Sequence, residues 1–291
     1  QALQDMLCII SPAKSLASTG LHLPIASTFP QFLTQTDGLV RALKSSLKPS
    51  DYKKLMSVSD VIAARTHSEY QTYLPNSHKS CGSDLLTSAA LLFDGPAYRG
   101  LDVATLSPQE VKACSKNVRF LSGLYGWLRC NDQIQNHRLE MGTKGLPIPG
   151  GNCKLLYDYW GTSIADAIVS EFSNVESGIL LNCASEEYFK VINKKLLKDK
   201  CPNITIITCA FTDKGQIKSV YAKRARGLMS RFVTVEEKIQ NELNNNTTKK
   251  SVDGNGKAKK AKGSSAENRL ETMINILKTF DYEGYKYQRT T

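Results

Sequence analysis

Apolar residues recur at two spacings along the chain, and together they predict strands interleaved with helices. A short continuous apolar run at 7–10 is typical of a buried strand. Similar runs stand at 118–128, 179–183, 204–210 and 217–221. Helical spacing and helix-breaking residues predict helices over 31–47, 50–56, 59–73, 82–92, 108–116, 162–172, 186–198 and 221–232. The alternation favours a mixed α/β (α/β or α+β) fold without internal repeats.

One polar tract interrupts this pattern. Residues 241–265 are mostly Asn, Thr, Lys, Gly and Ser, which cannot bury enough apolar surface to become ordered. Ser264 and Glu267 then form a capping box, and helical apolar spacing resumes at Leu270, Met273, Ile274 and Leu277. We therefore expect one compact domain over 6–291, interrupted by a flexible low-complexity insertion at about 241–265.

Composition narrows the class of protein. The chain has 291 residues, of which 41% are hydrophobic, and this share excludes wholesale disorder. No stretch approaches the ~18 apolar residues of a membrane span, so neither a transmembrane protein nor a membrane partner is expected. Residues 1–5 lack the features of a signal peptide, and the eight cysteines form no CxxC pair. We expect reduced thiols in a cytoplasmic protein.

The formal net charge of +11 points to polyanionic partners, although a merely basic surface would give the same value. Residues 249–262 hold six lysines and one aspartate, a net +5, so the rest of the chain carries +6. The lysine run at 257–262 leaves nuclear entry open as an alternative to the cytoplasm. The four histidines have no metal-ligand spacing, and we expect neither a metal nor another cofactor.

The segment 55–63, Leu-Met-Ser-Val-Ser-Asp-Val-Ile-Ala, joins two predicted helices. It resembles a helix-hairpin-helix, in which turn amides and the start of the second helix contact a DNA phosphate without reading bases. Ser57 and Ser59 replace the two glycines of that motif, and serine is less suited to positive φ. Two helices joined by a serine-capped turn is the alternative interpretation. Three cations would add positive charge beside the turn: Lys53, Lys54 and Arg65.

The helix predicted over 221–232 separates apolar from basic residues. Ala225, Leu228, Met229 and Phe232 share one face, whereas the cations lie opposite or at its edge. Those cations are Lys223, Arg224, Arg226 and Arg231. Because no acidic residue occurs in 214–234, the pattern favours a phosphate-binding surface over an ordinary solvated face.

Two further segments could carry chemistry. In 121–142, Gly123 and Gly126 permit close approach of a ligand or a neighbouring strand, and a cluster of Arg129, Asp132, Arg138 and Glu140 follows. The two carboxylates either act as acid and base or hold the arginines in place. In 182–190, a strand ends and a helix starts at Ser185, where capping explains the residues but α/β proteins also bind ligands.

Five collinear motifs are similar to those of the YaaA peroxide-stress family. They stand at 10–14, 55–63, 121–132 with 137–142, 182–188, and 221–229. The resemblance implies a single mixed α/β domain with a basic cleft and a helix-hairpin-helix, which binds duplex and branched DNA in connection with repair. It also implies a role in resisting hydrogen peroxide by limiting oxidative damage linked to free iron.

The resemblance carries over to individual positions. Basic positions of the motifs correspond to Lys14, Arg129, Arg138, Lys223, Arg226 and Arg231. Acidic positions correspond to Asp132, Glu140 and Glu187. The chain departs from the family pattern at Pro96, Ala97, Cys130, Asn131 and Asn136, so the local shape of the cleft is expected to differ.

Two functional hypotheses follow. The first is a non-enzymatic protein that contacts DNA phosphates, without sequence preference, through Lys14, Lys53, Lys54, Ser57, Ser59, Arg65, Arg129, Arg138, Lys223, Arg224, Arg226 and Arg231. The alternative is an enzyme acting on a nucleotide-like or phosphorylated substrate, with Lys14, Asp132 and Glu140 as candidate catalytic residues. An enzyme needs these side chains to converge in a deep pocket, whereas a DNA binder needs them along an open groove.

Overall fold

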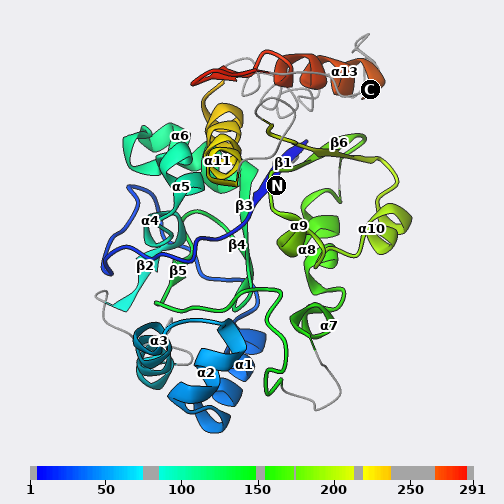
Figure 1. The fold of residues 1–291 in the computed structure, drawn as a ribbon. Coiled ribbons are helices and arrows are strands. Elements are labelled where there is room, and N and C mark those ends of the chain that lie inside the picture. The colour runs from blue at the N-terminus through cyan, green and yellow to red at the C-terminus, as the bar shows by residue number, and fades with distance from the viewer. Residues whose placement is uncertain are drawn as a thin grey trace.

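A five-stranded mixed sheet forms the centre of the computed structural model (Figure 1), which describes residues 5–74, 85–148, 155–173, 175–212, 219–236 and 266–286. Its strand order is β4-β3-β1-β6-β7. The strands are β1 (Met6–Ile10), β3 (Val118–Ser122), β4 (Gly126–Leu128), β6 (Gly178–Asn182) and β7 (Ile204–Thr208). All are parallel except β4, which forms an antiparallel hairpin with β3.

The sheet grows outward from the central strand β1 in two directions. The chain passes from β1 to β3 on one side of it, and later places β6 on the other side. Ile9 thus lies between Arg119 of β3 and Asn182 of β6. β1, β3 and β6 are buried along their whole length, which explains their largely continuous apolar runs. The boundary between β1 and β6 is therefore a topological switch point, where open α/β sheets leave a crevice at the carboxyl ends of the strands.

Helices cover both sides of this sheet (Figure 1). On one side are α4 (Ala89–Leu92), α5 (Pro96–Leu101), α6 (Pro108–Asn117) and α11 (Ser219–Val235). The 3-10 helix η3 (Val103–Thr105) lies between α5 and α6 in the chain. On the other are α7 (Leu156–Trp160), α8 (Ser163–Glu171), α9 (Glu186–Phe189) and α10 (Lys194–Lys200). No helix within the described residues combines the length and the apolar character that crossing a membrane requires.

The remaining elements lie at the two ends of the molecule (Figure 1). One end holds α1 (Leu33–Ser46), α2 (Pro49–Met56) and α3 (Asp60–Thr72). The other holds α13 (Ala266–Leu277) and the small hairpin of β8 (Asp281–Tyr282) and β9 (Tyr285–Lys286). A second small pair joins β2 (Thr87–Ser88) to β5 (Gln133–Ile134).

The predicted mixed α/β class and single compact domain are confirmed, and most predicted elements occur within a few residues of their expected bounds. The resumed helix after the insertion is α13, in which Met273 and Leu277 are buried. The predicted insertion and the Ser264–Glu267 capping box lie outside the described residues. The domain bounds of 6–291 stay a prediction.

Four element predictions need correction. The run 118–128 is a hairpin of two strands rather than one strand. In the predicted strand 217–221, the described part belongs to α11, whose amphipathic pattern extends back to residue 219. In the described part of the predicted helix 82–92, the α-helix begins at residue 89, because Thr87 pairs with Ile134 in β2–β5. The predicted helix 186–198 is broken in two, since the Asn193 side chain caps α10 by accepting from the Leu196 N–H (3.0 Å).

A close approach of two helices fixes α11 on the sheet. A Cβ atom at Gly227 of α11 would lie 1.7 Å from the carbonyl oxygen of Ala97 in α5. One at Gly100 of α5 would lie 2.5 Å from the carbonyl oxygen of Arg224. Only glycine permits this backbone contact. It holds the basic residues of α11 next to the carboxyl ends of β1 and β6.

Candidate functional site

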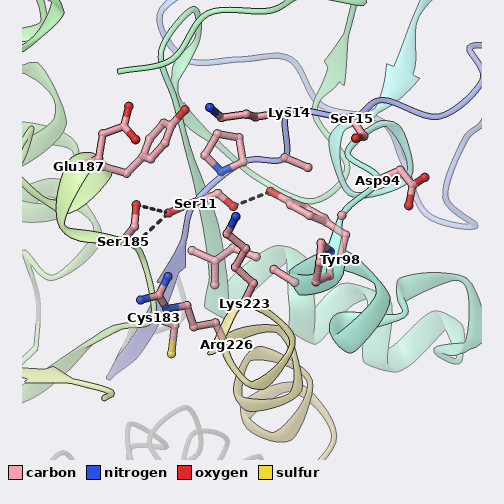
Figure 2. A pocket seen from close by; sticks show the side chains of 17 residues that line it. Ser11, Lys14, Ser15, Asp94, Tyr98, Cys183, Ser185, Glu187, Lys223 and Arg226 are labelled. Atoms are coloured by element: carbon pink, nitrogen blue, oxygen red, sulfur yellow. Dashed lines mark hydrogen bonds between the residues drawn. The ribbon is translucent and has the colours of Figure 1, made fainter. Parts of the chain in front are cut away.

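A cavity of about 240 Å³ opens at the carboxyl ends of β1 and β6, at the topological switch point (Figure 2). Three chain segments supply most of its wall: 10–15 after β1, 94–98 at the start of α5, and 183–188 after β6. Lys223 and Arg226 of α11 complete it. This position includes the strand end at which the sequence left a ligand site open beside a capping role, and it is where the first and fourth family motifs meet.

The floor of the cavity is held by hydrogen bonds between the two strand ends (Figure 2). The Ser11 hydroxyl accepts from the Ser185 backbone N–H (2.9 Å) and donates to the Ser185 hydroxyl (3.2 Å). The Tyr98 hydroxyl donates to the Ser11 carbonyl (3.2 Å). Each contact joins segments that are far apart in sequence. Together they hold the polar side chains of the floor in place.

Lys223 and Arg226 lie one turn apart on α11 and both line the cavity (Figure 2). Within the described part of the chain, no acidic side chain forms an ion pair with either one. Arg226 Nε is buried and has no hydrogen-bond partner there. Burial lowers the pKa of the Arg226 guanidinium, because desolvation disfavours its charged form.

Cys183 lies beside Arg226 but does not supply a counter-charge. Hydrogen bonds with the thiols of Cys209 and Cys8, together with burial, raise the pKa of Cys183 well above its usual value. The thiol is therefore neutral near pH 7. A neutral buried thiol is also a poor nucleophile, so the geometry gives no support to thiol chemistry in the cavity.

The outer rim of the cavity mixes both signs of charge. Lys14 Nζ lies 3.4 Å from Glu140 Oε1, and Arg138 Nη2 lies 3.1 Å from the same oxygen. Glu187 Oε1 accepts from the Gly142 N–H (3.0 Å), and Asp94 accepts from Arg99, so both acids of the wall have partners. Of the sequence-predicted residues, Lys14, Lys223 and Arg226 line the cavity, whereas Glu140 and Arg138 are connected to it through the contact of Glu140 with Lys14.

Asp132 lies away from this cavity. Its carboxylate accepts from the Thr28 hydroxyl (2.6 Å) and from the Arg129 backbone N–H (2.7 Å), and the side chain is buried. Burial raises its pKa, against the effect of these hydrogen bonds. Arg129 is also outside the lining, with its Nη2 3.9 Å from Glu171 Oε1. In the structure these two residues close a turn.

The segment 55–63 forms a turn between α2 and α3, which both interpretations of the sequence predicted. Ser57 takes the left-handed conformation (φ 49°, ψ 50°) that glycine supplies in the motif. The Ser59 hydroxyl accepts from the Ile62 N–H (3.4 Å) and caps α3. Tyr52 stacks on Tyr70 with ring centroids 5.7 Å apart, which fixes the two helices against each other.

The cations of this hairpin are mostly paired. Lys53 Nζ lies 2.8 Å from Asp60 Oδ1, and Arg65 Nε lies 2.9 Å from Glu69 Oε1. Both pairs are on the surface, where an ion pair contributes only about 0–1 kcal/mol and exchanges readily with solvent or another anion. Lys54 is exposed.

The other two predicted cations of α11 serve the fold. Arg224 forms an ion pair with Glu283 of the β8–β9 turn, with Nε 2.6 Å from Oε2. Arg231 Nη1 donates to the carbonyls of Leu101 and Asp102 (2.9 Å each) at the end of α5. Of the four cations predicted on this helix, two therefore line the cavity and two hold other parts of the fold in place.

Sequence reasoning missed part of the wall. Ser11 and Tyr98 were not expected in the site, although the position of Ser11 just after a strand is a usable signal. Pro96 and Ala97, which depart from the family pattern, do line the cavity, and the difference in its local shape stays a prediction. Gly123, by contrast, approaches backbone rather than a ligand, since a Cβ there would lie 2.3 Å from the Leu139 carbonyl oxygen.

These features define a mixed α/β protein with a cavity at a switch point, lined by Lys14, Lys223 and Arg226 among others, and a separate helical hairpin. The chain belongs to the YaaA peroxide-stress family, because the model for "Peroxide stress protein YaaA" matches residues 6–251. This match confirms the family that the five motifs indicated. It also ties the chain to the peroxide stress response at the level of the family.

Relatives from several bacteria support the assignment. A UPF0246 protein of Polynucleobacter necessarius is 41% identical over 235 residues, which cover 80% of this chain and 87% of that protein. A UPF0246 protein of Aliivibrio fischeri is 38% identical over 255 residues, covering 86% and 92%. One of Shewanella amazonensis is 36% identical over 286 residues, covering 97% and 93%.

Proposed function

We propose that this peroxide-stress protein binds DNA through phosphate contacts made by the α2–α3 hairpin, without reading the base sequence. The observation that carries the proposal is the conformation of Ser57, at φ 49° and ψ 50°. The replacement of glycine was the main argument against a DNA-binding hairpin, and the serine adopts the left-handed turn regardless. Because the N–H groups of Ser57 and Val58 donate to the Lys53 carbonyl, we assign the phosphate contact to the amides at the start of α3.

The surroundings of the turn suit a phosphate backbone. The first amides of any helix lack acceptors within that helix, and Ser59 takes only the N–H of Ile62. Val61 at the start of α3 is 79% exposed, so the turn is accessible. Lys53 and Lys54 stand at the end of α2, where a phosphate can replace Asp60 as the partner of Lys53.

The wider role proposed for this binding is protection of DNA during peroxide stress, with duplex and branched DNA as partners and a link to repair. An effect on free iron would be indirect. Direct iron binding needs clustered ligands, and the described residues contain no group of three or more His, Cys, Asp or Glu side chains that could hold a metal ion. A cytoplasmic location stays part of the proposal.

The test is binding of the full chain to labelled duplex, junction and single-stranded DNA across a salt series. Log affinity should fall by about 0.9 per log unit of salt for each phosphate neutralised. The double variant Lys53→Gln/Lys54→Gln should weaken duplex binding and reduce the salt slope by about 2, because each lysine contacts one phosphate.

The matched control removes two lysines from a helix on another part of the surface. Lys195→Gln/Lys198→Gln on α10 changes the net charge equally and should alter duplex affinity less than twofold. If both double variants weaken binding alike, the net charge and not the hairpin is responsible. Absence of duplex affinity, or affinity independent of salt, would overturn the proposal.

A further inference from the structure

We propose that the cavity at the ends of β1 and β6 binds a phosphate monoester attached to a flat ring. A nucleoside 5′-monophosphate and the phosphorylated 5′ end of a DNA strand share this chemistry. The inference goes beyond duplex binding by the hairpin, since the cavity belongs to other elements and takes another kind of ligand.

The positive charges on the α11 side of the cavity favour an anion there. Lys223 and Arg226 both line it, and neither forms an ion pair with an acid in the described residues. Arg226 Nε is buried without a hydrogen-bond partner, and an unpaired buried donor on a charged group carries a large desolvation cost. An anion bound beside Lys223 and Arg226 would compensate both charges through charge-assisted hydrogen bonds.

A phosphate monoester matches this charge better than a diester does. Near pH 7 a monoester carries about 1.5 to 2 negative charges, close to the two positive charges of Lys223 and Arg226. A backbone diester carries only one negative charge. It also lies within a duplex, whose major groove alone is about 12 Å wide. A cavity of about 240 Å³ accepts a small molecule or a strand end but not a duplex.

The rest of the wall suits a ring and its hydroxyl groups. Pro12, Pro96 and Tyr98 contribute apolar surface, while Ser11 and Ser185 contribute hydroxyls that are already oriented by their mutual contacts (Figure 2). Small-molecule sites usually combine apolar walls with a few fixed polar groups in this way. We therefore assign the α11 side of the cavity to the phosphate and the proline and tyrosine surface to the ring.

Calorimetric titration of the full chain tests the assignment. Adenosine 5′-monophosphate is compared with adenosine and inorganic phosphate, and a 5′-phosphorylated trinucleotide with its unphosphorylated form. Each phosphorylated ligand should bind at least tenfold more tightly than its unphosphorylated counterpart. The relative affinities of the nucleotide and the trinucleotide then show which source of the monoester the cavity prefers.

The variants use neighbouring residues of one helix. Lys223→Gln and Arg226→Gln should each weaken the nucleotide at least tenfold, and the exposed Lys223 position keeps the test valid if loss of Arg226 disturbs folding. Arg224→Gln removes the same charge outside the cavity, where Arg224 faces Glu283, and should change affinity less than twofold.

Three results would overturn the proposal. They are equal binding of adenosine and its monophosphate, equal losses from Lys223→Gln and Arg224→Gln, and no measurable binding of any phosphorylated ligand at millimolar concentration. None of them bears on duplex binding by the hairpin, so failure here is distinguishable from failure of the proposed function.

Discussion

The α2–α3 hairpin and the cavity at the strand ends both present cations, but they hold them differently. Lys53 and Arg65 of the hairpin have acidic partners on α3, at the surface. Lys223 and Arg226 of the cavity have no acidic partner among the described residues, and Arg226 is partly buried. The hairpin cations can therefore exchange one weak surface partner for another. The two cations of the cavity have no acidic partner to give up, so an anion would compensate their charge directly.

The hairpin lies at one end of the molecule (Figure 1), and contacts along one loop connect it to the cavity rim. The Tyr70 hydroxyl of α3 donates to the Arg138 carbonyl (3.0 Å), Arg138 contacts Glu140, and Glu140 contacts Lys14 at the cavity rim. This chain of contacts ends at Lys14 on the rim of the cavity and does not include Lys223 or Arg226. Variants can thus affect one region and spare the other.

The largest effect is expected from Gly227→Ala. The added methyl group would lie 1.7 Å from the Ala97 carbonyl oxygen, so α11 must move away from α5. We expect a loss of about 3 kcal/mol in the free energy of unfolding, at the upper end of overpacking costs, and loss of nucleotide binding. Urea unfolding and calorimetry measure the two effects. Unchanged stability would show that the α5–α11 contact does not fix the cavity.

The next effect is a pH dependence from the buried His137, next to the connecting loop. Burial lowers its pKa to about 4, below the unfolded value of about 6.5, so the unfolded chain binds the proton more tightly. Stability should fall by about 2 kcal/mol between pH 8 and pH 5 from this group alone. Urea unfolding across this range measures it. His137→Gln should remove that part of the slope, and an unaltered slope would assign it elsewhere.

A smaller effect is expected in the hairpin from Ser59→Ala. Loss of the hydroxyl that accepts from the Ile62 N–H should reduce the free energy of unfolding by about 1 kcal/mol. Frayed amides at the start of α3 should also weaken duplex binding, while nucleotide binding stays the same. A parallel loss of both ligands would mean that the two regions are not independent.

The smallest expected effect is stabilisation by Ser57→Gly. Glycine removes the cost of the left-handed conformation but adds entropy to the unfolded chain, with a net gain of about 0.5 kcal/mol. Duplex affinity should be unchanged or slightly higher, since the turn keeps its shape. Thermal unfolding and duplex titration check both points, and a marked loss of affinity would implicate the serine side chain itself.

Sequence patterns predicted the parts of both regions but not their assembly. The turn of the hairpin is local, so the spacing of residues 55–63 was enough to predict it. The cavity depends on β1 and β6 becoming neighbours, although more than 160 residues separate them. Local pattern likewise could not show that Glu283 neutralises Arg224, or that Asp132 is enclosed by Thr28 rather than placed in the site.

The central claim, that the hairpin binds duplex and the cavity binds a phosphate monoester, is tested most directly by competition. Full-length protein holding labelled duplex is titrated with adenosine 5′-monophosphate past saturation of the cavity. We predict that duplex affinity changes less than twofold at constant ionic strength. Displacement of the duplex with a midpoint equal to the dissociation constant of the nucleotide would contradict the claim, because both ligands would then share one site.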